Sequence, residues 1–195
     1  MKYLNQQFIN RLLCLLILTG CYKTEFKVYS NSSVPFRFTY PGEWKIVETK
    51  DPNIAVKIVS KEMIDNSQPA GLVQAMYLKN IPEWPVLQNE NSRSNYLVKF
   101  NELIISSAKA DPKNELSDIQ VCSNFFIESK GFPPNLISVF EYKIKVQSTT
   151  AYLVEGTLVQ GRNFYRIICS TRESLEDSYR ERFLTLIKSV DVQRR

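Results

Sequence analysis

The chain has 195 residues, of which 44% are hydrophobic and 12% aromatic, and its formal net charge is +5. This length and composition predict one folded domain with its own core and argue against disorder. The sequence has no histidine, which excludes Ser-His-Asp and Cys-His catalytic pairs and every imidazole metal ligand. The cations are spread along the chain, whereas a nucleic-acid site would need them clustered.

The first 20 residues have the layout of a secretory signal. Lys2 and Arg11 are followed by the unbroken apolar run 12–18, which is far shorter than the roughly 20 residues that span a bilayer. The next residues, Leu18-Thr19-Gly20-Cys21, resemble the lipobox of bacterial lipoproteins. The resemblance implies cleavage before Cys21, acylation of that cysteine with palmitate-type chains, and a protein held on a membrane outside the cytoplasm. The alternatives are an ordinary signal in which Cys21 is incidental and a weak anchor that is never cut.

Only two cysteines remain for the folded domain. Cys14 leaves with the signal and Cys21 is the acylation site, so Cys122 and Cys169 remain. In an oxidising compartment these two could form a disulfide, whose loop of 46 residues would stabilise the fold by about 4 kcal/mol. The alternative is a pair of buried free thiols.

The chain divides into three parts by composition. Residues 1–20 are the signal, residues 21–33 are the lipidated cysteine and a polar tether that ends in Ser30-Asn31-Ser32-Ser33, and residues 34–195 are the domain.

Alternating apolar residues predict strands in the first half of the domain. Phe36, Phe38 and Tyr40 alternate with polar residues, and Tyr40-Pro41-Gly42-Glu43 then fits a type II turn at which the chain reverses into a strand over residues 44–47. Two more strands are predicted over residues 55–59 and 72–78, with a loop over residues 66–69.

Residues 92–110 predict an amphipathic helix. Tyr96, Phe100, Leu103 and Ile104 share one face at helical spacing, and we expect that face to cover a sheet. Ala110-Asp111-Pro112 ends the helix, because proline cannot continue it.

The second half predicts a series of antiparallel strands and a closing helix. Apolar residues alternate over 119–127 and 140–146, where Glu141, Lys143 and Lys145 form the predicted wet face, and a hairpin joins strands 151–160 and 163–169 around Gly161-Arg162.

A helix is predicted over residues 174–190, with a buried stripe that includes Tyr179 and Phe183. The spacings of Ser170 with Glu173 and of Ser174 with Asp177 fit a capping box. The acidic residues Glu173, Glu176 and Asp177 gather at the positive end of the helix dipole.

Two segments carry a resemblance to a known superfamily. Phe36-Arg37-Phe38-Thr39-Tyr40-Pro41-Gly42-Glu43-Trp44 is the first, and the closing run of residues 157–190 is the second. They resemble the PsbP-like superfamily, which includes the extrinsic P-subunit of photosystem II, its lipid-anchored cyanobacterial relative, the Ran-interacting transport factor and the envelope lipoprotein DcrB. The resemblance implies an α+β fold in which helices flank an antiparallel sheet, an α/β/α sandwich.

The resemblance also implies a binding or assembly module rather than an enzyme, with no catalytic residues or cofactor. Cyanobacterial members of the superfamily have been linked to metal binding through histidine and acidic groups, but this chain has no histidine, so we expect no metal. We therefore expect a lipid-anchored envelope protein, on the periplasmic face, that docks on a membrane-associated protein partner and does not bind nucleic acid. A photosystem II assembly or stability factor in a thylakoid lumen is the second hypothesis. The third, from another class, is an enzyme that uses the carboxylates Glu115 and Asp118, or Glu173 and Asp177.

Loop aromatics and prolines are the candidate partner contacts. They are Trp84, which lies between two prolines, and Phe132-Pro133-Pro134. The alternative is that each of these residues caps the core. For Trp84 this means that its ring packs inward as a lid beside the edge of the sheet.

Overall fold

The computed structural model describes residues 25–192 except 33, 66, 80–89, 111–115, 132–133 and 147. In chain order the elements are β1 (Phe26–Asn31), β2 (Val34–Pro41), β3 (Lys45–Val47), β4 (Ile54–Val59), β5 (Met63–Ile64), β6 (Gln68–Pro69), β7 (Gly71–Leu78), α2 (Glu90–Ala110), β8 (Leu116–Glu128), β9 (Leu136–Val146), β10 (Thr149–Gln160), β11 (Asn163–Arg172), the short 3₁₀ helix η1 (Glu173–Leu175), α3 (Glu176–Lys188) and β12 (Asp191–Val192).

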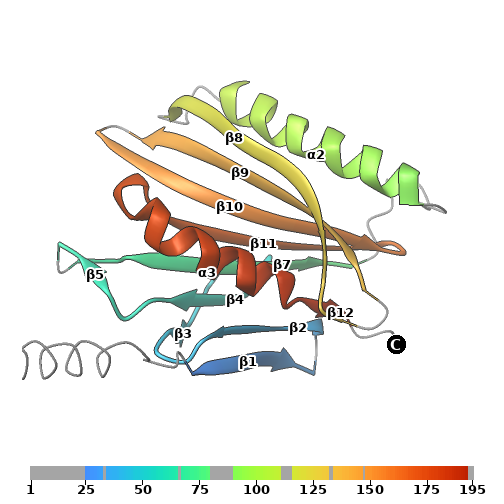
Figure 1. The fold of residues 1–195 in the computed structure, drawn as a ribbon, viewed down its shortest axis with the longest axis horizontal. Helices are drawn as coiled ribbons and strands as arrows, with labels where there is room; N and C mark the ends of the chain where they lie inside the picture. The colour runs from blue at the N-terminus through green and yellow to red at the C-terminus, as the bar shows by residue number, and fades with distance from the viewer. Residues whose placement is uncertain are drawn as a thin grey trace, which may run out of the picture.

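A seven-stranded sheet forms the middle of the molecule (Figure 1). Its order is β3-β4-β7-β11-β10-β9-β8, and every neighbouring pair is antiparallel. The β10–β11 hairpin turns at Gly161, whose φ of +59° is a left-handed conformation that favours glycine. The predicted hairpin is therefore confirmed.

One face of this sheet carries the main core. Helix α3 and the small sheet β1-β2-β12 both pack there (Figure 1). Trp44 lies 6.0 Å from Tyr179 and 6.3 Å from Phe183, measured between ring centroids. Gly156 on β10 permits the close approach of α3, because a Cβ atom there would lie 2.5 Å from Cγ2 of Ile187.

Helix α2 covers part of the other face and is held by two smaller apolar clusters. One contains Leu97 with Val159 and Phe164, and the other contains Ile105 against Phe140. The buried face of α2 differs from the predicted one, because Leu103 is 61% exposed while Asn101 is buried. In the described part of the chain, no helix combines the length and apolar character needed to cross a bilayer.

The architecture is the predicted α+β fold, with an antiparallel sheet between helical layers. Strand β2 shows why the sequence could predict it. Phe36 and Phe38 are buried against the main sheet while Arg37 is exposed, because successive side chains of a strand point to opposite faces.

Two predictions near the N-terminus are wrong. The tether predicted over residues 21–33 contains strand β1, which pairs with β2 along its length and buries Tyr29, so the fold begins before Val34. The chain also does not reverse into a neighbouring strand after Tyr40, although the predicted turn and the strand that follows it are present. The turn carries the chain from the small sheet into β3 of the large sheet, with the Trp44 N–H donating to the carbonyl of Pro41.

Strand β8 departs from the predicted alternation at a bulge. The pairing register with β9 shifts between Val121 and Ser123. As a result Ile119 packs in the cluster beneath α2, while Phe125 and Ile127 pack against the main core on the opposite face. A bulge adds one residue to one strand, which reverses the parity of every side chain beyond it.

The predicted capping box is absent. Helix α3 begins after η1 with no side-chain hydrogen bond at its N-cap. Its acidic first turn is instead tied to the sheet, because the ammonium of Lys143 lies 3.0 Å from Glu173 and 2.7 Å from Glu176. The hydrogen bond to Glu176 raises the pKa of Lys143 above its ordinary value, and the hydrogen bond to Glu173 adds to this effect.

Candidate functional site

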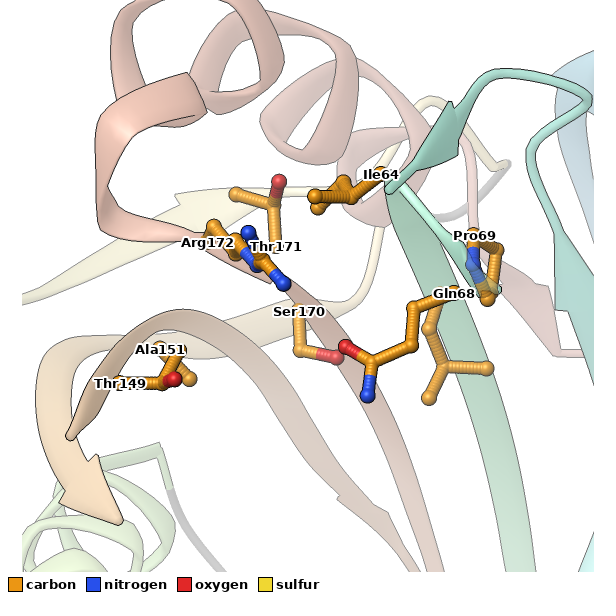
Figure 2. A pocket seen from close by; sticks show the side chains of 9 residues that line it. Ile64, Gln68, Pro69, Thr149, Ala151, Ser170, Thr171 and Arg172 are labelled. Carbon is orange, nitrogen blue, oxygen red and sulfur yellow. The ribbon is translucent and has the colours of Figure 1, made fainter. Parts of the chain in front are cut away.

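A pocket of about 260 Å³ opens beside the β5–β6 hairpin (Figure 2). The hairpin forms one wall, and the start of β10 and the end of β11 form the other. Its lining residues are Ile64, Gln68, Pro69, Leu72, Thr149, Ala151, Ser170, Thr171 and Arg172. Three segments that are distant in the sequence thus meet at one end of the sheet.

Backbone hydrogen bonds fix the hairpin that forms this wall. Met63 pairs with Pro69 and Ile64 with Gln68, and the Ser67 N–H donates to the carbonyl of Ile64 across the turn at 3.2 Å. These contacts hold Ile64 and Gln68 at fixed positions on the pocket wall.

The base of the hairpin is attached to β11. The hydroxyl of Thr171 donates to the carbonyl of Ala70 at 2.6 Å and is buried. In addition, the hydroxyl of Ser60 accepts from the Gly71 N–H and donates to the carbonyl of Glu62. The pocket is therefore a preformed feature of the fold.

Arg172 supplies the charge of the pocket. Its Nη1 lies 2.8 Å from Oδ2 of Asp65, and the two side chains are 33% and 70% exposed. Asp65 has a φ of 53°, a left-handed conformation that aspartate adopts more readily than most residues. The Nε of Arg172 is buried without a hydrogen-bond partner among the described residues, so the guanidinium is not fully satisfied.

The remaining lining is mostly apolar with a few neutral polar groups. Figure 2 shows the Ser170 hydroxyl and the Gln68 amide directed toward one another across the pocket. Pockets for drug-sized ligands usually measure about 300–1,000 Å³. A volume near 260 Å³ fits one large side chain or the end of a chain.

Two fully buried carboxylates lie elsewhere, on opposite faces of the sheet. Glu155 is bound by two nitrogens of Arg166, with Nε at 2.8 Å and Nη2 at 2.7 Å, and by the hydroxyl of Tyr142. On the α3 face, Glu141 is bound by Arg180 through Nε at 2.9 Å and Nη2 at 2.8 Å. Each carboxylate is engaged by a complete set of donors, which is the arrangement of a structural ion pair rather than of an acid–base catalyst.

The pKa of Glu141 reflects these competing effects. Burial raises the pKa of this carboxyl, but the hydrogen bonds from Arg180 and Tyr152 and the charge of Arg180 outweigh burial, so the pKa lies below its ordinary value. The Tyr152 hydroxyl donates to Glu141 at 2.5 Å, and burial and this bond raise the pKa of Tyr152. The predicted wet face of β9 is therefore wrong at Glu141, which is 3% exposed beneath α3.

Most of the residues predicted as sites are not brought together. Cys21, Trp84, Phe132 and Pro133 lie outside the described residues, as does Glu115. Asp118 lies on β8, Glu173 lies in η1, where it pairs with Lys143, and Asp177 lies in the first turn of α3. Among the residues described, no three cysteine or carboxylate side chains are grouped to hold a metal ion.

The two remaining cysteines are free thiols, but only one of them is buried as the alternative to a disulfide predicts. Cys122 is exposed on the edge strand β8, whereas Cys169 is buried on β11. Strands β9 and β10 lie between them, and strands spaced about 4.8 Å apart put roughly 14 Å between the two. This exceeds the reach of a disulfide, which needs Cα atoms within about 7 Å.

The pocket residues carry no local signal in the sequence. Arg172, Gln68 and Ser170 are ordinary surface types at strand ends, and only the register of β7, β10 and β11 places them together. The weak signal available was Arg172 itself, the cation at the end of strand β11.

Comparison with solved structures relates this arrangement to known folds. The cyanobacterial PsbP (CyanoP) from Synechocystis superposes with a TM-score of 0.60 at 14% identity, over 89% of this chain and 95% of that one. The chain has a PsbP-like fold. LpqN of Mycobacterium tuberculosis, described as involved in cell envelope biogenesis, shares it with a TM-score of 0.57 at 9% identity, over 87% and 92% of the two chains.

The PsbP-like fold extends to a eukaryotic protein. The Ran-binding protein Mog1p of Saccharomyces cerevisiae superposes with a TM-score of 0.52 at 6% identity, over 87% of this chain and 96% of that one. No protein-family model matches the sequence, and no curated protein matches it either. At these identities the similarity concerns the fold, and function has to be argued from the site.

Proposed function

We propose that this chain is a lipid-anchored, non-enzymatic envelope protein that binds a membrane-associated protein partner through the pocket beside the β5–β6 hairpin. The observation that carries the proposal is the pocket itself, which is preformed, mostly apolar and sized for a single anchoring side chain. Protein interfaces concentrate binding energy in such small, well-packed pockets with a polar rim. Gln68 and Arg172 supply that rim.

The similar structures support a binding role. Mog1p is a Ran-binding protein and LpqN is involved in cell envelope biogenesis, and both have this fold. The lipobox-like Leu18-Thr19-Gly20-Cys21 supports membrane attachment, because two or more acyl chains anchor a protein stably without a spanning helix.

Partner binding is tested by crosslinking in intact cells. We expect the wild-type chain to capture a membrane-associated protein that Ala151→Trp, which fills the pocket, does not capture. Leu103→Trp is the matched control, because Leu103 is exposed on α2 on a different part of the molecule. Capture that is equal for all three chains would contradict the proposal.

The anchor is tested separately. We expect Cys21→Ala to move the protein from the membrane fraction to the soluble fraction, and we expect mass spectrometry of the native N-terminus to show an acylated Cys21. An unmodified thiol at Cys21, or a chain that still begins at Met1, would contradict lipidation.

A second candidate is a photosystem II assembly or stability factor in a thylakoid lumen. The structural similarity to CyanoP favours it. It requires a photosynthetic host, and deletion of the gene in such a host should then lower oxygen evolution. Normal oxygen evolution, or a host that lacks photosystems, would exclude it.

A further inference from the structure

The positive charge of Arg172 in the pocket is only weakly paired with Asp65. Arg172 pairs with Asp65 through Nη1 alone, and Asp65 is 70% exposed. Such surface ion pairs contribute little to stability, so an incoming anion can displace Asp65 at little cost.

The guanidinium also has donor capacity to spare. Arginine presents five N–H donors in a planar fork that fits a carboxylate with two hydrogen bonds. In this structure the Nε of Arg172 is buried and has no hydrogen-bond partner among the described residues. A buried donor without a partner is uncommon and calls for an explanation. Because this Nε has almost no accessible surface, a carboxylate in the pocket would be bound by the Nη donors of the side chain, which is 33% exposed.

The apolar part of the pocket lies directly beside this cation. Ile64, Pro69, Leu72 and Ala151 line the same 260 Å³ as Arg172, so the ligand must carry an apolar group close to a carboxylate. The last residue of a protein chain does so, because its side chain and its carboxylate share one Cα atom. An internal segment could insert one side chain, but the apolar group and the carboxylate would then have to come from two separate residues.

We propose that the pocket binds the C-terminal carboxylate and the last apolar side chain of the partner protein, with Arg172 as the carboxylate-binding residue. The proposal rests on the proposed function and specifies which part of the partner is bound. The Ser170 hydroxyl and the Gln68 amide are placed to bind the same terminal residue (Figure 2).

Fluorescence anisotropy of labelled peptides tests this with the full chain in detergent. The probes are an eight-residue Gly/Ser peptide that ends in Val-Leu with a free carboxylate, and the same peptide with a C-terminal amide. We expect the amide to bind at least tenfold more weakly, since hydrogen bonds to a charged group contribute about 1.5–3 kcal/mol and each 1.4 kcal/mol is tenfold in affinity.

Variants identify the residue responsible. Arg172→Gln should abolish the preference for the free acid, and Asp65→Asn should strengthen binding of the free acid several-fold by releasing Arg172. Arg162→Gln is the matched control, because Arg162 is exposed in the β10–β11 turn, and it should bind like wild type. An unchanged melting temperature of Arg172→Gln shows that the variant is folded.

Several outcomes overturn the proposal. They are equal binding of acid and amide, no binding at millimolar peptide, or competition by hexanoate as effective as that of the unlabelled acid peptide, which would show that any apolar carboxylate suffices. If a partner captured in cells is retained by Arg172→Gln but lost by Ala151→Trp, the proposed function stands and the C-terminal assignment fails. If neither variant affects capture, the proposed function fails as well.

Discussion

At the level of single residues, the buried ion pairs show how this sheet tolerates charge in its interior. Glu155 has no exposed surface, and the side chain of Arg166 that neutralises it is 18% exposed. Removing one member of a buried pair usually costs more than the pair contributes, because the other charge is left without a partner.

Arg166→Met should therefore lower the free energy of unfolding by about 3–5 kcal/mol, measured by urea denaturation. Arg162→Met on the exposed turn is the control and should change it by less than about 0.5 kcal/mol. The double variant Arg166→Met/Glu155→Leu should recover much of the loss, since the charge of Glu155 is then no longer left without its partner. A loss below about 1 kcal/mol in the single variant would contradict the structural role of the Arg166–Glu155 pair.

Glu141 predicts how stability depends on pH. Because its pKa is lower in the fold than in the unfolded chain, where the value is near 4.3, its contribution is present above that value. The contribution is lost as the pH falls through the folded pKa. We expect Glu141→Gln to be less stable than wild type at pH 7 and to lose less stability on acidification. The measurement is the urea midpoint between pH 2.5 and 7. Glu128→Gln, which removes the same charge at an exposed position, is the control and should have the same midpoints as wild type. A curve for Glu141→Gln that runs parallel to that of wild type would contradict the prediction.

At the level of elements, helices α2 and α3 differ in how they are held. Helix α3 contributes Tyr179, Phe183 and Ile187 to the main core. Helix α2 rests on two small clusters, and beneath it Oδ1 of Asn101 and Oγ1 of Thr157 are buried without hydrogen-bond partners among the described residues. Unsatisfied polar groups and sparse apolar contact lower the free energy of local opening.

We expect the backbone amides of α2 to exchange with deuterium at least tenfold faster than those of α3. Leu97→Ala should speed exchange in α2 further and leave α3 unchanged, because Leu97 belongs to a cluster that α3 does not contact. Hydrogen exchange read by mass spectrometry of peptides from both helices provides the measurement. Equal protection in the two helices would show that they open as one unit.

The sequence could predict elements that have a local pattern, but not contacts between segments that are distant in the chain. Strand β2 has one apolar side, so alternation reveals it, and the Gly161-Arg162 turn marks the hairpin that joins β10 and β11. The bulge near Cys122 left no trace in residue type. Glu141 resembled a solvent-facing residue because its partner Arg180 lies on α3, 39 positions away. The pocket likewise depends on strand register that no local pattern encodes.

At the level of the whole molecule, the fold joins two sheets through aromatic packing. Phe36 of the small sheet meets Tyr165 of the large sheet at 5.8 Å, edge to face. Tyr29 of β1 lies 5.2 Å from Phe38. The small sheet therefore covers part of the main core, and β1 is part of that cover although its sequence resembles a polar tether.

Truncation tests this boundary. A chain that begins at Glu25 keeps β1 and should be as stable as the longer chain, whereas one that begins at Val34 loses Tyr29 and the strand that pairs with β2. We expect the shorter chain to be less stable by at least about 3 kcal/mol, the usual cost of removing a buried aromatic side chain. Thermal unfolding gives the comparison, and Tyr29→Ala in the chain from Glu25 separates the loss of the ring from the loss of the strand. Equal melting temperatures for the two truncated chains would place residues 25–33 outside the fold, as a tether.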